Sequence, residues 1–261
     1  MLLVLQHNVG RSSDVLAGVM ESAVKKKADL VLVQEAPEFH GSSHPAYDYL
    51  WTNGRVMTAR RKSSDWKVSV ESGLTREACG DVQVLALGRR GHQVRVLRVV
   101  NTYFQRIGRE GDYWPAERAK WDDILAEENT IVAGDFNAHS RMWNPRCNTR
   151  RNATFLEGLI TGFDLQVLND GTTTRPARRE GDTPDSDIDL TLAGAGAGPD
   201  CRGWRVLKKE EDAMPSDHEV IEWRWERLTM RVDPKWKMRG WALKGRLDKE
   251  KAEEEEEKEE D

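Results

Sequence analysis

Short apolar runs rich in Val, Ile and Leu recur along the first 226 residues, and polar residues close each run. Runs of this kind are typical of buried strands, whereas an amphipathic helix repeats its apolar positions about every three to four residues. We predict strands at residues 2–8, 29–34, 47–51, 55–59, 66–70, 81–87, 94–101, 130–133, 186–192 and 219–225. Helices are predicted at residues 14–27, with Ser13 or Asp14 as the N-cap, and at residues 115–127 and 152–160.

The run at residues 130–133 opens into Gly134-Asp135-Phe136-Asn137, the most informative stretch of the chain. Gly134 allows a sharp turn where the strand ends. If the chain stays extended, Asp135 and Asn137 point to one face and Phe136 points to the other. The Asp135 carboxylate can take a proton and the Asn137 amide can hold an anionic oxygen, a combination that suits phosphoester chemistry. By itself, an Asp-x-Asn at a strand end is more often a turn cap.

Similar polar residues stand at the ends of other predicted strands. In chain order the set reads Asn, Gln-Glu, Asn-x-Tyr, Gly-Asp-Phe-Asn, Ile-Asp-Leu and Ser-Asp-His. Its members are Asn8, Gln34-Glu35, Asn101-Thr102-Tyr103, Gly134-Asp135-Phe136-Asn137, Ile188-Asp189-Leu190 and Ser216-Asp217-His218. Any one of these motifs is a weak signal, but together and in order they are a strong one.

The ordered set resembles the endonuclease/exonuclease/phosphatase superfamily, the Mg²⁺-dependent phosphodiesterases that include the apurinic endonucleases. The resemblance covers residues 1–226. Within it, Gly-Asp-Phe-Asn-Ala-His-Ser followed by Trp143, then Asn169-Asp170-Gly171-Thr172 and Ile188-Asp189-Leu190-Thr191-Leu192, is similar to the endonuclease domain of non-LTR (LINE-type) retrotransposons. The element order favours an α/β sandwich over a doubly wound sheet. The resemblance makes this a DNase I-like fold of four layers, two sheets flanked by helices.

The resemblance also implies a hard divalent cation. Glu35 would be the main metal ligand, Asn8 would lie beside it, and Asp217 would complete the metal neighbourhood. Oxygen ligands with no cysteine nearby suit Mg²⁺, with Mn²⁺ as an alternative, far better than zinc. The chain departs from the apurinic endonucleases at Gly10, where those enzymes carry a second acid. LINE-type members tolerate that loss. The departure therefore weakens the case for a DNA-repair function more than the case for a nicking function.

Further roles at the scissile phosphate follow from the same resemblance. Asp135 would orient or deprotonate the attacking water, and Asn137 would hydrogen-bond a phosphate oxygen. His218 would contact the phosphate and be oriented by Asp189, because a carboxylate beside an imidazole favours the protonated ring. Tyr103 would donate a hydrogen bond to the phosphate.

Each of these residues also has a purely structural interpretation. Glu35 can be a solvent-facing residue at a strand end, and Tyr103 can be a core tyrosine. Asp187 points to the same side as Asp189 in an extended segment, so which of the two meets His218 stays open; the Ile-Asp-Leu motif favours Asp189. The functional interpretation is favoured for the set as a whole, because the structural one requires several coincidences in sequence order.

Charge is divided unevenly along the chain. The formal net charge is −5, of which residues 248–261 contribute −7 and residues 227–247 contribute +6, leaving −4 for residues 1–226. Local arginine clusters are therefore more informative than the total. We expect two such clusters beside the site, where they would grip DNA backbone phosphates, with solvated loop arginine as the alternative. The clusters are Arg141, Arg146, Arg150 and Arg151, and Arg175, Arg178 and Arg179.

The length of 261 residues allows one sizeable α/β domain and an appendage. We assign residues 1–226 to the domain, and residues 227–261 to a basic, aromatic linker and a charged tail that is disordered or helical. No apolar run is long enough to span a bilayer, and no signal-peptide pattern opens the chain. Three widely spaced cysteines, Cys79, Cys147 and Cys201, indicate reduced thiols and an intracellular setting. Within the cell, we expect a nuclear location.

The predicted function is a metal-dependent endonuclease, a hydrolase that nicks DNA for target-primed reverse transcription. Its partners would be DNA and a reverse transcriptase domain in a longer parent protein, with no membrane. No Tyr/Phe-x-Asp-Asp polymerase signature occurs, so we expect a truncated element copy, an excised domain or a host gene derived from one. Two alternatives stay open: another phosphodiesterase or phosphatase of the superfamily, and a domesticated copy that binds nucleic acid without cutting.

Overall fold

The computed structural model of the chain describes residues 1–38, 44–51, 54–75, 80–89, 96–105, 115–150, 153–177, 185–207 and 216–227. The chain divides into a compact unit, Met1–Glu226, and a second unit, Arg227–Asp261. The predicted linker and tail fall in the second unit, which lies outside the described residues except for Arg227. All described helices and strands belong to Met1–Glu226.

The first sheet consists of β11 (Cys201–Leu207), β12 (Val220–Trp225), β1 (Leu2–Asn8), β2 (Leu30–Gln34), β4 (Val56–Arg61) and β3 (Tyr47–Trp51), in that order. Strands β1 and β2 are parallel, because helix α1 (Ser13–Lys26) carries the chain back between them. All other neighbours in this sheet are antiparallel. The sheet therefore has one parallel pair at its centre.

The second sheet repeats this plan. It consists of β5 (Trp66–Val70), β6 (Val82–Arg89), β7 (Leu97–Tyr103), β8 (Thr130–Asp135), β10 (Asp189–Ala193) and β9 (Gln166–Val167), in that order. Its central pair, β7 and β8, is parallel, and the other neighbours are antiparallel. The remaining elements are η2 (Pro115–Arg118), η4 (Gly198–Asp200), α2 (Ser72–Thr75), α3 (Trp121–Leu125) and α4 (Thr154–Gly162).

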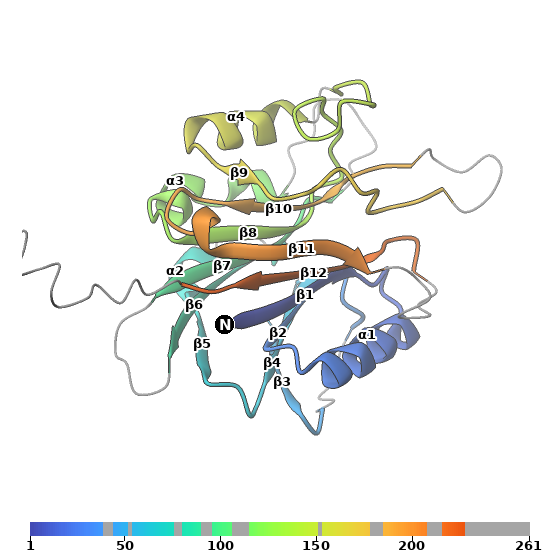
Figure 1. Cartoon of the computed structure of the whole chain (residues 1–261), viewed down its shortest axis with the longest axis vertical. Helices are drawn as coiled ribbons and strands as arrows, with labels where there is room; N and C mark the ends of the chain where they lie inside the picture. The colour runs from blue at the N-terminus through green and yellow to red at the C-terminus, as the bar shows by residue number, and fades with distance from the viewer. Residues whose placement is uncertain are drawn as a thin grey trace, which may run out of the picture. The chain divides into compact units, whose positions relative to one another are not determined.

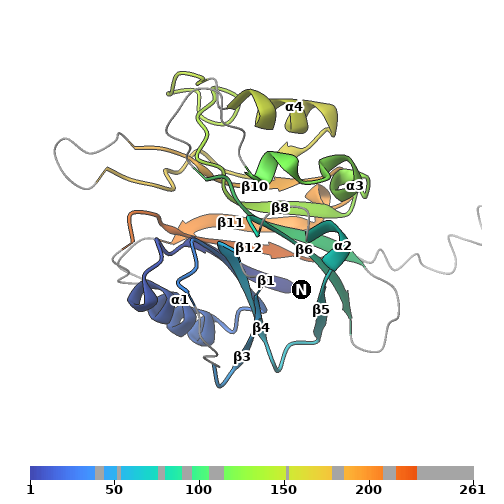
Figure 2. The same cartoon turned by 180° about the vertical axis from the view of Figure 1, so that it is seen from behind.

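The two sheets are stacked between helices. Helix α1 lies outside the first sheet, and α3 and α4 lie outside the second (Figures 1 and 2). Strand β1 shows how the sequence fills the layers: Leu2 and Val4 enter the core between the sheets, whereas Leu3 and Leu5 enter the core under α1. Because both faces are buried, the strand reads as a continuous apolar run. The predicted four-layer α/β sandwich is confirmed.

All ten predicted strands are present, and the ends of most of them differ from the prediction by a few residues. The strand predicted at residues 94–101 begins at Leu97 and continues to Tyr103, and residue 94 lies outside the described residues. The sequence pattern does not predict β9 or β11. Strand β9 has only two residues, and β11 has an irregular pairing between Arg202 and Arg205 that breaks its alternation.

The helix predictions need three corrections. The N-cap of α1 is Ser12, whose Oγ accepts a hydrogen bond from the Val15 backbone N at 3.3 Å, and not Ser13 or Asp14. The helix predicted at residues 115–127 is interrupted at Lys120, where ψ of 70° is not helical, and leaves the short η2 and α3. The helix predicted at residues 152–160 is α4, which begins at Thr154. None of the described helices is long and apolar enough to cross a membrane.

The layer between the sheets becomes polar toward one edge. Gln6 is fully buried, and its Nε2 donates to the Gly134 and Leu190 carbonyl oxygens at 3.1 and 3.4 Å. Gln34 Nε2 donates to Asn101 Oδ1 at 2.7 Å. A buried amide without partners would cost roughly 1–3 kcal/mol. These bonds therefore favour one placement of the first sheet on the second.

Candidate active site

The predicted site residues gather at the edge where the central parallel strands of both sheets end. Asn8 ends β1 and Glu35 follows β2, whereas Tyr103 ends β7 and Asp135 ends β8. Parallel neighbours present their carboxyl ends at the same edge of a sheet, which is where α/β proteins commonly bind ligands. The stacking of the sheets then places the two pairs at one edge of the sandwich.

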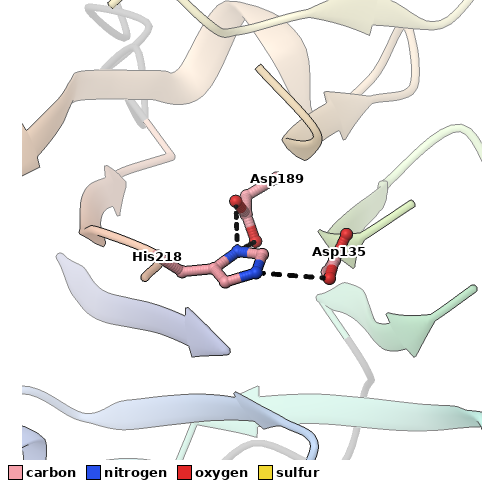
Figure 3. A group of neighbouring side chains, drawn as sticks. All are labelled: Asp135, Asp189 and His218. Atoms are coloured by element: carbon pink, nitrogen blue, oxygen red, sulfur yellow. Dashed lines mark hydrogen bonds and ion pairs between the residues drawn. The ribbon is translucent and has the colours of Figure 1, made fainter. Parts of the chain in front are cut away.

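Two antiparallel strands add a carboxylate and an imidazole to this edge. Strand β10 begins at Asp189, which is paired with Asp135 of β8, and His218 lies just before β12. Asp189 Oδ2 and Oδ1 lie 2.8 and 3.0 Å from His218 Nδ1. The other ring nitrogen, Nε2, lies 3.9 Å from Asp135 Oδ2 (Figure 3). One nitrogen of the ring is therefore held, and the other faces Asp135.

Asp189, and not Asp187, is the acid that contacts His218. Regular pairing of β10 begins only at Asp189, and the described residues just before it, 185–188, make one isolated bridge, between Ser186 and Arg175. The Asp187 carboxylate instead has its Oδ2 3.9 Å from Arg146 Nη2. The alternation that places both acids on one side of an extended strand does not reach back to Asp187.

The Gly-Asp-Phe-Asn motif bends sharply, which corrects the extended conformation considered from the pattern. A Cβ at Gly134 would lie 1.8 Å from the Thr102 carbonyl oxygen, so only glycine fits beside β7. Asn137 has φ of 47°, in the left-handed region. Its backbone N donates to Asp135 Oδ1 at 2.8 Å, and its Nδ2 lies 3.2 Å from Asp135 Oδ2. The bend thus brings the two side chains together, while Phe136 is buried in the core.

Burial determines the electrostatics of the central group. Asp135, Asp189 and His218 are 1%, 2% and 7% exposed. Burial, and then Asp189, raise the pKa of Asp135 to about 7, against the opposing effects of His218 and of the hydrogen bonds that Asp135 accepts. Burial lowers the pKa of His218, but Asp189 and the other nearby carboxylates outweigh it and raise that pKa to about 9. A cationic ring therefore faces a carboxylate that can accept a proton near neutral pH.

Asn8 and Glu35, the two predicted metal ligands that end or follow strands of the first sheet, also have fixed hydrogen-bond partners. Asn8 Nδ2 donates to Asp135 Oδ2 at 2.8 Å, and Asn8 Oδ1 accepts from the Gly10 backbone N at 2.9 Å. Glu35 Oε1 accepts a hydrogen bond from the Tyr103 hydroxyl. Burial and this bond raise the pKa of Tyr103, so its hydroxyl stays a donor. Gly10, where apurinic endonucleases carry an acid, contributes a backbone N–H here.

Asp217 lies on the exposed side of His218. Its side chain is 50% exposed, and its Oδ1 is 4.0 Å from His218 Nε2. Ser216 Oγ donates to the Asn8 carbonyl oxygen at 2.9 Å and accepts from the His218 backbone N at 3.1 Å, which fixes this segment against β1. Burial would raise the pKa of Asp217, but His218 and then Arg175 outweigh it and lower that pKa. Asp217 is thus held as a carboxylate.

The buried group has the spacing of a metal site. Asp135, Asp189 and His218 offer ligand atoms that all lie within 4.8 Å of one another, and no other such group of acids, histidines or cysteines occurs in the described part of the chain. Cys147 and Cys201 are free thiols that do not join it, and Cys79 lies outside the described residues.

Three of the predicted DNA-contacting arginines lie on an exposed loop, residues 141–150, which we call the arginine loop. The end of the loop lies beside the segment that follows the Gly-Asp-Phe-Asn motif, because the Arg150 backbone N donates to the His139 carbonyl oxygen at 2.9 Å. Arg141 donates to acceptors within the loop. The Arg146 side chain is 70% exposed, and its Nη2 donates to the Gly171 carbonyl oxygen at 3.1 Å. The residues Arg151, Arg178 and Arg179 lie outside the described residues.

We predict that changing Arg146, Arg150 and Arg151 together to alanine weakens DNA binding and flattens its salt dependence, by up to about one unit of slope for each phosphate that the variant no longer binds. Turnover at saturating DNA should change little, because no residue of the buried group is touched. Fluorescence anisotropy of a labelled duplex in rising salt measures the slope. Lys25, Lys27 and Lys67, all exposed, provide a matched triple alanine control. A slope equal to that of the parent protein would show that the arginine loop does not contact DNA.

Two supporting residues carry little sequence signal. Thr174 Oγ1 accepts hydrogen bonds from the backbone N of Ile188 and Asp189 at 3.2 and 3.1 Å, and so holds the start of β10. Thr174 is the last of three consecutive threonines, and the sequence gives no indication that this one has that role. Gln6 joins the two sheets below the site, and its only sequence signal is a polar side chain inside an apolar strand.

Comparisons with known proteins agree with this geometry. Residues 99–222 match a protein-family model described as endonuclease-reverse transcriptase. No curated protein shows significant sequence similarity to the chain. Among solved structures, the endonuclease domain of TRAS1, a telomere-specific non-LTR retrotransposon, is 20% identical with a TM-score of 0.67, over 88% of this chain and 100% of that one.

Two further structures have the same fold. The AP endonuclease LMAP from Leishmania major is 12% identical with a TM-score of 0.66, over 86% of this chain and 88% of that one. The 3′ phosphatase NExo from Neisseria, bound to a product DNA hairpin, is 17% identical with a TM-score of 0.61, over 87% and 100%. The family model, the two-sheet fold and the ordered motifs together confirm that the chain resembles the endonuclease/exonuclease/phosphatase superfamily and, within it, the endonuclease domain of non-LTR retrotransposons.

Proposed function

We propose that this protein is a metal-dependent endonuclease that nicks DNA and so provides an end for target-primed reverse transcription. One observation carries the proposal: Asp135, Asp189 and His218 come from three distant segments and meet around one buried imidazole. A buried ring between two carboxylates costs desolvation energy, and such groups concentrate at functional sites. The nuclease-type fold and the retrotransposon endonuclease among its structural neighbours support the substrate class.

The residues beside the buried group fit a hard cation. Two buried carboxylates, Asp135 and Asp189, face one imidazolium, and a cation would relieve the repulsion between them. A ring protonated on both nitrogens has no lone pair for a metal, so His218 is not assigned to it. Glu35 and the Asn8 amide oxygen would hold Mg²⁺, or Mn²⁺ as the alternative. Once bound, the cation would neutralise charge on the phosphate oxygens.

The chain's own residues supply the rest of the chemistry. Asp135 accepts the proton of the attacking water, for which a pKa of about 7 is well matched. His218 directs positive charge from Nε2 toward a non-bridging phosphate oxygen, while Asp189 holds Nδ1. Asn137 and Tyr103 donate hydrogen bonds to the phosphate, and Tyr103 leaves Glu35 to do so.

The reaction forms a bond between the water oxygen and phosphorus and breaks the bond between phosphorus and the 3′ oxygen. The water proton passes to Asp135 and then to solvent, and the leaving oxygen takes up a proton from solvent. The products are a 5′-phosphate and a 3′-hydroxyl. A 3′-hydroxyl is the end that a reverse transcriptase extends.

The expected result is conversion of supercoiled plasmid to open circles in Mg²⁺ or Mn²⁺, and none in EDTA. The nick should prime a DNA polymerase directly, since its end is a 3′-hydroxyl. An abasic duplex, an RNA hairpin and an inositol phosphate tested at equal concentration separate this activity from the other activities of the superfamily. No relaxation above the EDTA control, by protein whose folding is verified by circular dichroism, would contradict the proposal and favour a protein that binds without cutting.

A further inference from the structure

Arg175 lies beside the site and differs from the other arginines around it. By sequence it belongs to a cluster expected to grip backbone phosphates, together with Arg178 and Arg179. In the structure its guanidinium turns back onto the protein: Nε and Nη2 donate to the same oxygen, Oδ2 of Asp217, at 2.9 and 2.7 Å. Its side chain is 26% exposed, compared with 70% for Arg146. This geometry suits holding a carboxylate better than reaching a distant phosphate.

The carboxylate that Arg175 holds is the one next to the exposed nitrogen of His218. Asp217 Oδ2 is bound by Arg175, and Asp217 Oδ1 lies 4.0 Å from His218 Nε2. That separation is beyond a hydrogen bond. The same Nε2 is the nitrogen that faces Asp135, at 3.9 Å from its Oδ2. Arg175 therefore restrains an acid that would otherwise be free to approach this nitrogen.

Backbone and side-chain hydrogen bonds fix the segment around Arg175 to the segments that carry Asp189 and His218. Arg175 and Ser186 exchange backbone hydrogen bonds of 2.9 and 3.0 Å just before β10. The preceding residue, Thr174, accepts from the Asp189 backbone N through Oγ1 at 3.1 Å, and its carbonyl oxygen accepts from the Glu219 backbone N at 2.8 Å. Arg175 thus starts from a position set by the segments that carry Asp189 and His218. Its reach to Asp217 follows from that position.

We propose that Arg175 is a positioning residue for the nicking reaction, which keeps the Asp217 carboxylate from pairing with His218 Nε2 and so leaves that nitrogen free for the scissile phosphate. The inference rests on the proposed function and adds a residue to it. Without Arg175, Asp217 Oδ2 loses both hydrogen bonds, and in the described part of the chain the imidazolium of His218 is the other cation beside this carboxylate. If Asp217 paired with Nε2, the positive charge of His218 would no longer act on the scissile phosphate. DNA contacts farther from the site would be unaffected.

The test is a double-mutant cycle on the full chain. Arg175→Gln should lower kcat by about 10- to 100-fold, the size expected when a reacting group is displaced. KM and the salt dependence of DNA binding should stay at their parent values. Asp217→Asn removes the competing charge, so adding Arg175→Gln to Asp217→Asn should cost no further activity. Arg146→Gln is the matched control, and it should affect binding and salt dependence instead.

A second measurement does not depend on cleavage. The His218 ring signals in ¹H–¹³C NMR, assigned by their absence from His218→Gln, are recorded without metal or DNA. These signals should shift in Arg175→Gln. The spectrum of the double variant Arg175→Gln/Asp217→Asn should overlay the spectrum of Asp217→Asn. If the parent protein fails to cut DNA, the proposed function is lost, but this spectrum still decides whether Arg175 acts on His218 through Asp217.

Two results would overturn the inference. The first is an equal loss of kcat from Arg175→Gln in the presence and in the absence of Asp217, which would mean that the two residues act independently. The second is a His218 spectrum in Arg175→Gln that overlays the parent spectrum. If Arg175→Gln does not fold, Arg175→Lys takes its place in the same cycle, since lysine keeps the charge but lacks the planar guanidinium fork.

Discussion

Asp135→Asn is expected to lower the single-turnover rate of plasmid nicking by about 10³-fold or more, toward the upper end of what a general base supplies. Asparagine has nearly the same shape as aspartate and can still accept the Asn137 backbone hydrogen bond, but it cannot take a proton from water. DNA affinity should stay within about threefold of the parent value, because the change affects the reacting phosphate and not the distant ones. Anisotropy and gel-based nicking measure the two effects separately.

Stability should move the other way in this variant. The pKa of Asp135 is raised to about 7 by burial and by Asp189, so its charged form destabilises the fold, increasingly as pH rises from its unfolded value toward 7. Neutral asparagine removes that penalty. In EDTA at pH 7–8, the Tm of Asp135→Asn should be no lower than that of the parent protein.

Asp187→Asn is the matched control for Asp135→Asn, because Asp187 is also buried but faces Arg146 and not His218. It should keep nicking activity within about threefold of the parent rate, as expected for a residue that does not touch the reacting atoms. Near-parent activity of Asp135→Asn, or an equal loss in Asp187→Asn, would show that the base is assigned to the wrong residue.

His218→Gln should lower kcat by about 10²- to 10³-fold, since glutamine carries no positive charge toward the phosphate. It should also destabilise the protein. Removing one partner of a buried ion pair leaves an uncompensated charge and costs about 3–5 kcal/mol, and here Asp189 would lose its partner. The loss of activity should be measured well below the lowered Tm.

The double variant Asp189→Asn/His218→Gln separates chemistry from folding. It removes the stranded charge, so it should recover much of the stability and none of the activity. His44→Gln, a change at a partly buried histidine that packs near Tyr47, should leave kcat unchanged. Recovery of nicking in the double variant would mean that His218 acts only through stability.

Local residue patterns predict much of this fold. The strands at residues 47–51 and 66–70 have the predicted bounds, because a short apolar or alternating run is legible without its neighbours. The pattern fails where tertiary packing decides a local choice. The helix expected at residues 115–127 breaks before Trp121, whose indole Nε1 donates to the Ala116 carbonyl oxygen at 2.8 Å. No helical repeat could show that hydrogen bond.

The site shows the same division. Chain order alone reveals which residue types stand at the ends of the strands, because an Asp, Asn, Glu or His that closes a buried run is visible without any knowledge of the fold. Three features of the site emerge only from the folded chain: Asp189 and not Asp187 meets His218, Asn137 reaches Asp135 through a left-handed bend, and Arg175 turns inward to Asp217. Strand alternation is a local property of the sequence. These contacts instead depend on where regular strand pairing begins and on how the two sheets stack, and both are determined by residues that lie far apart in the chain.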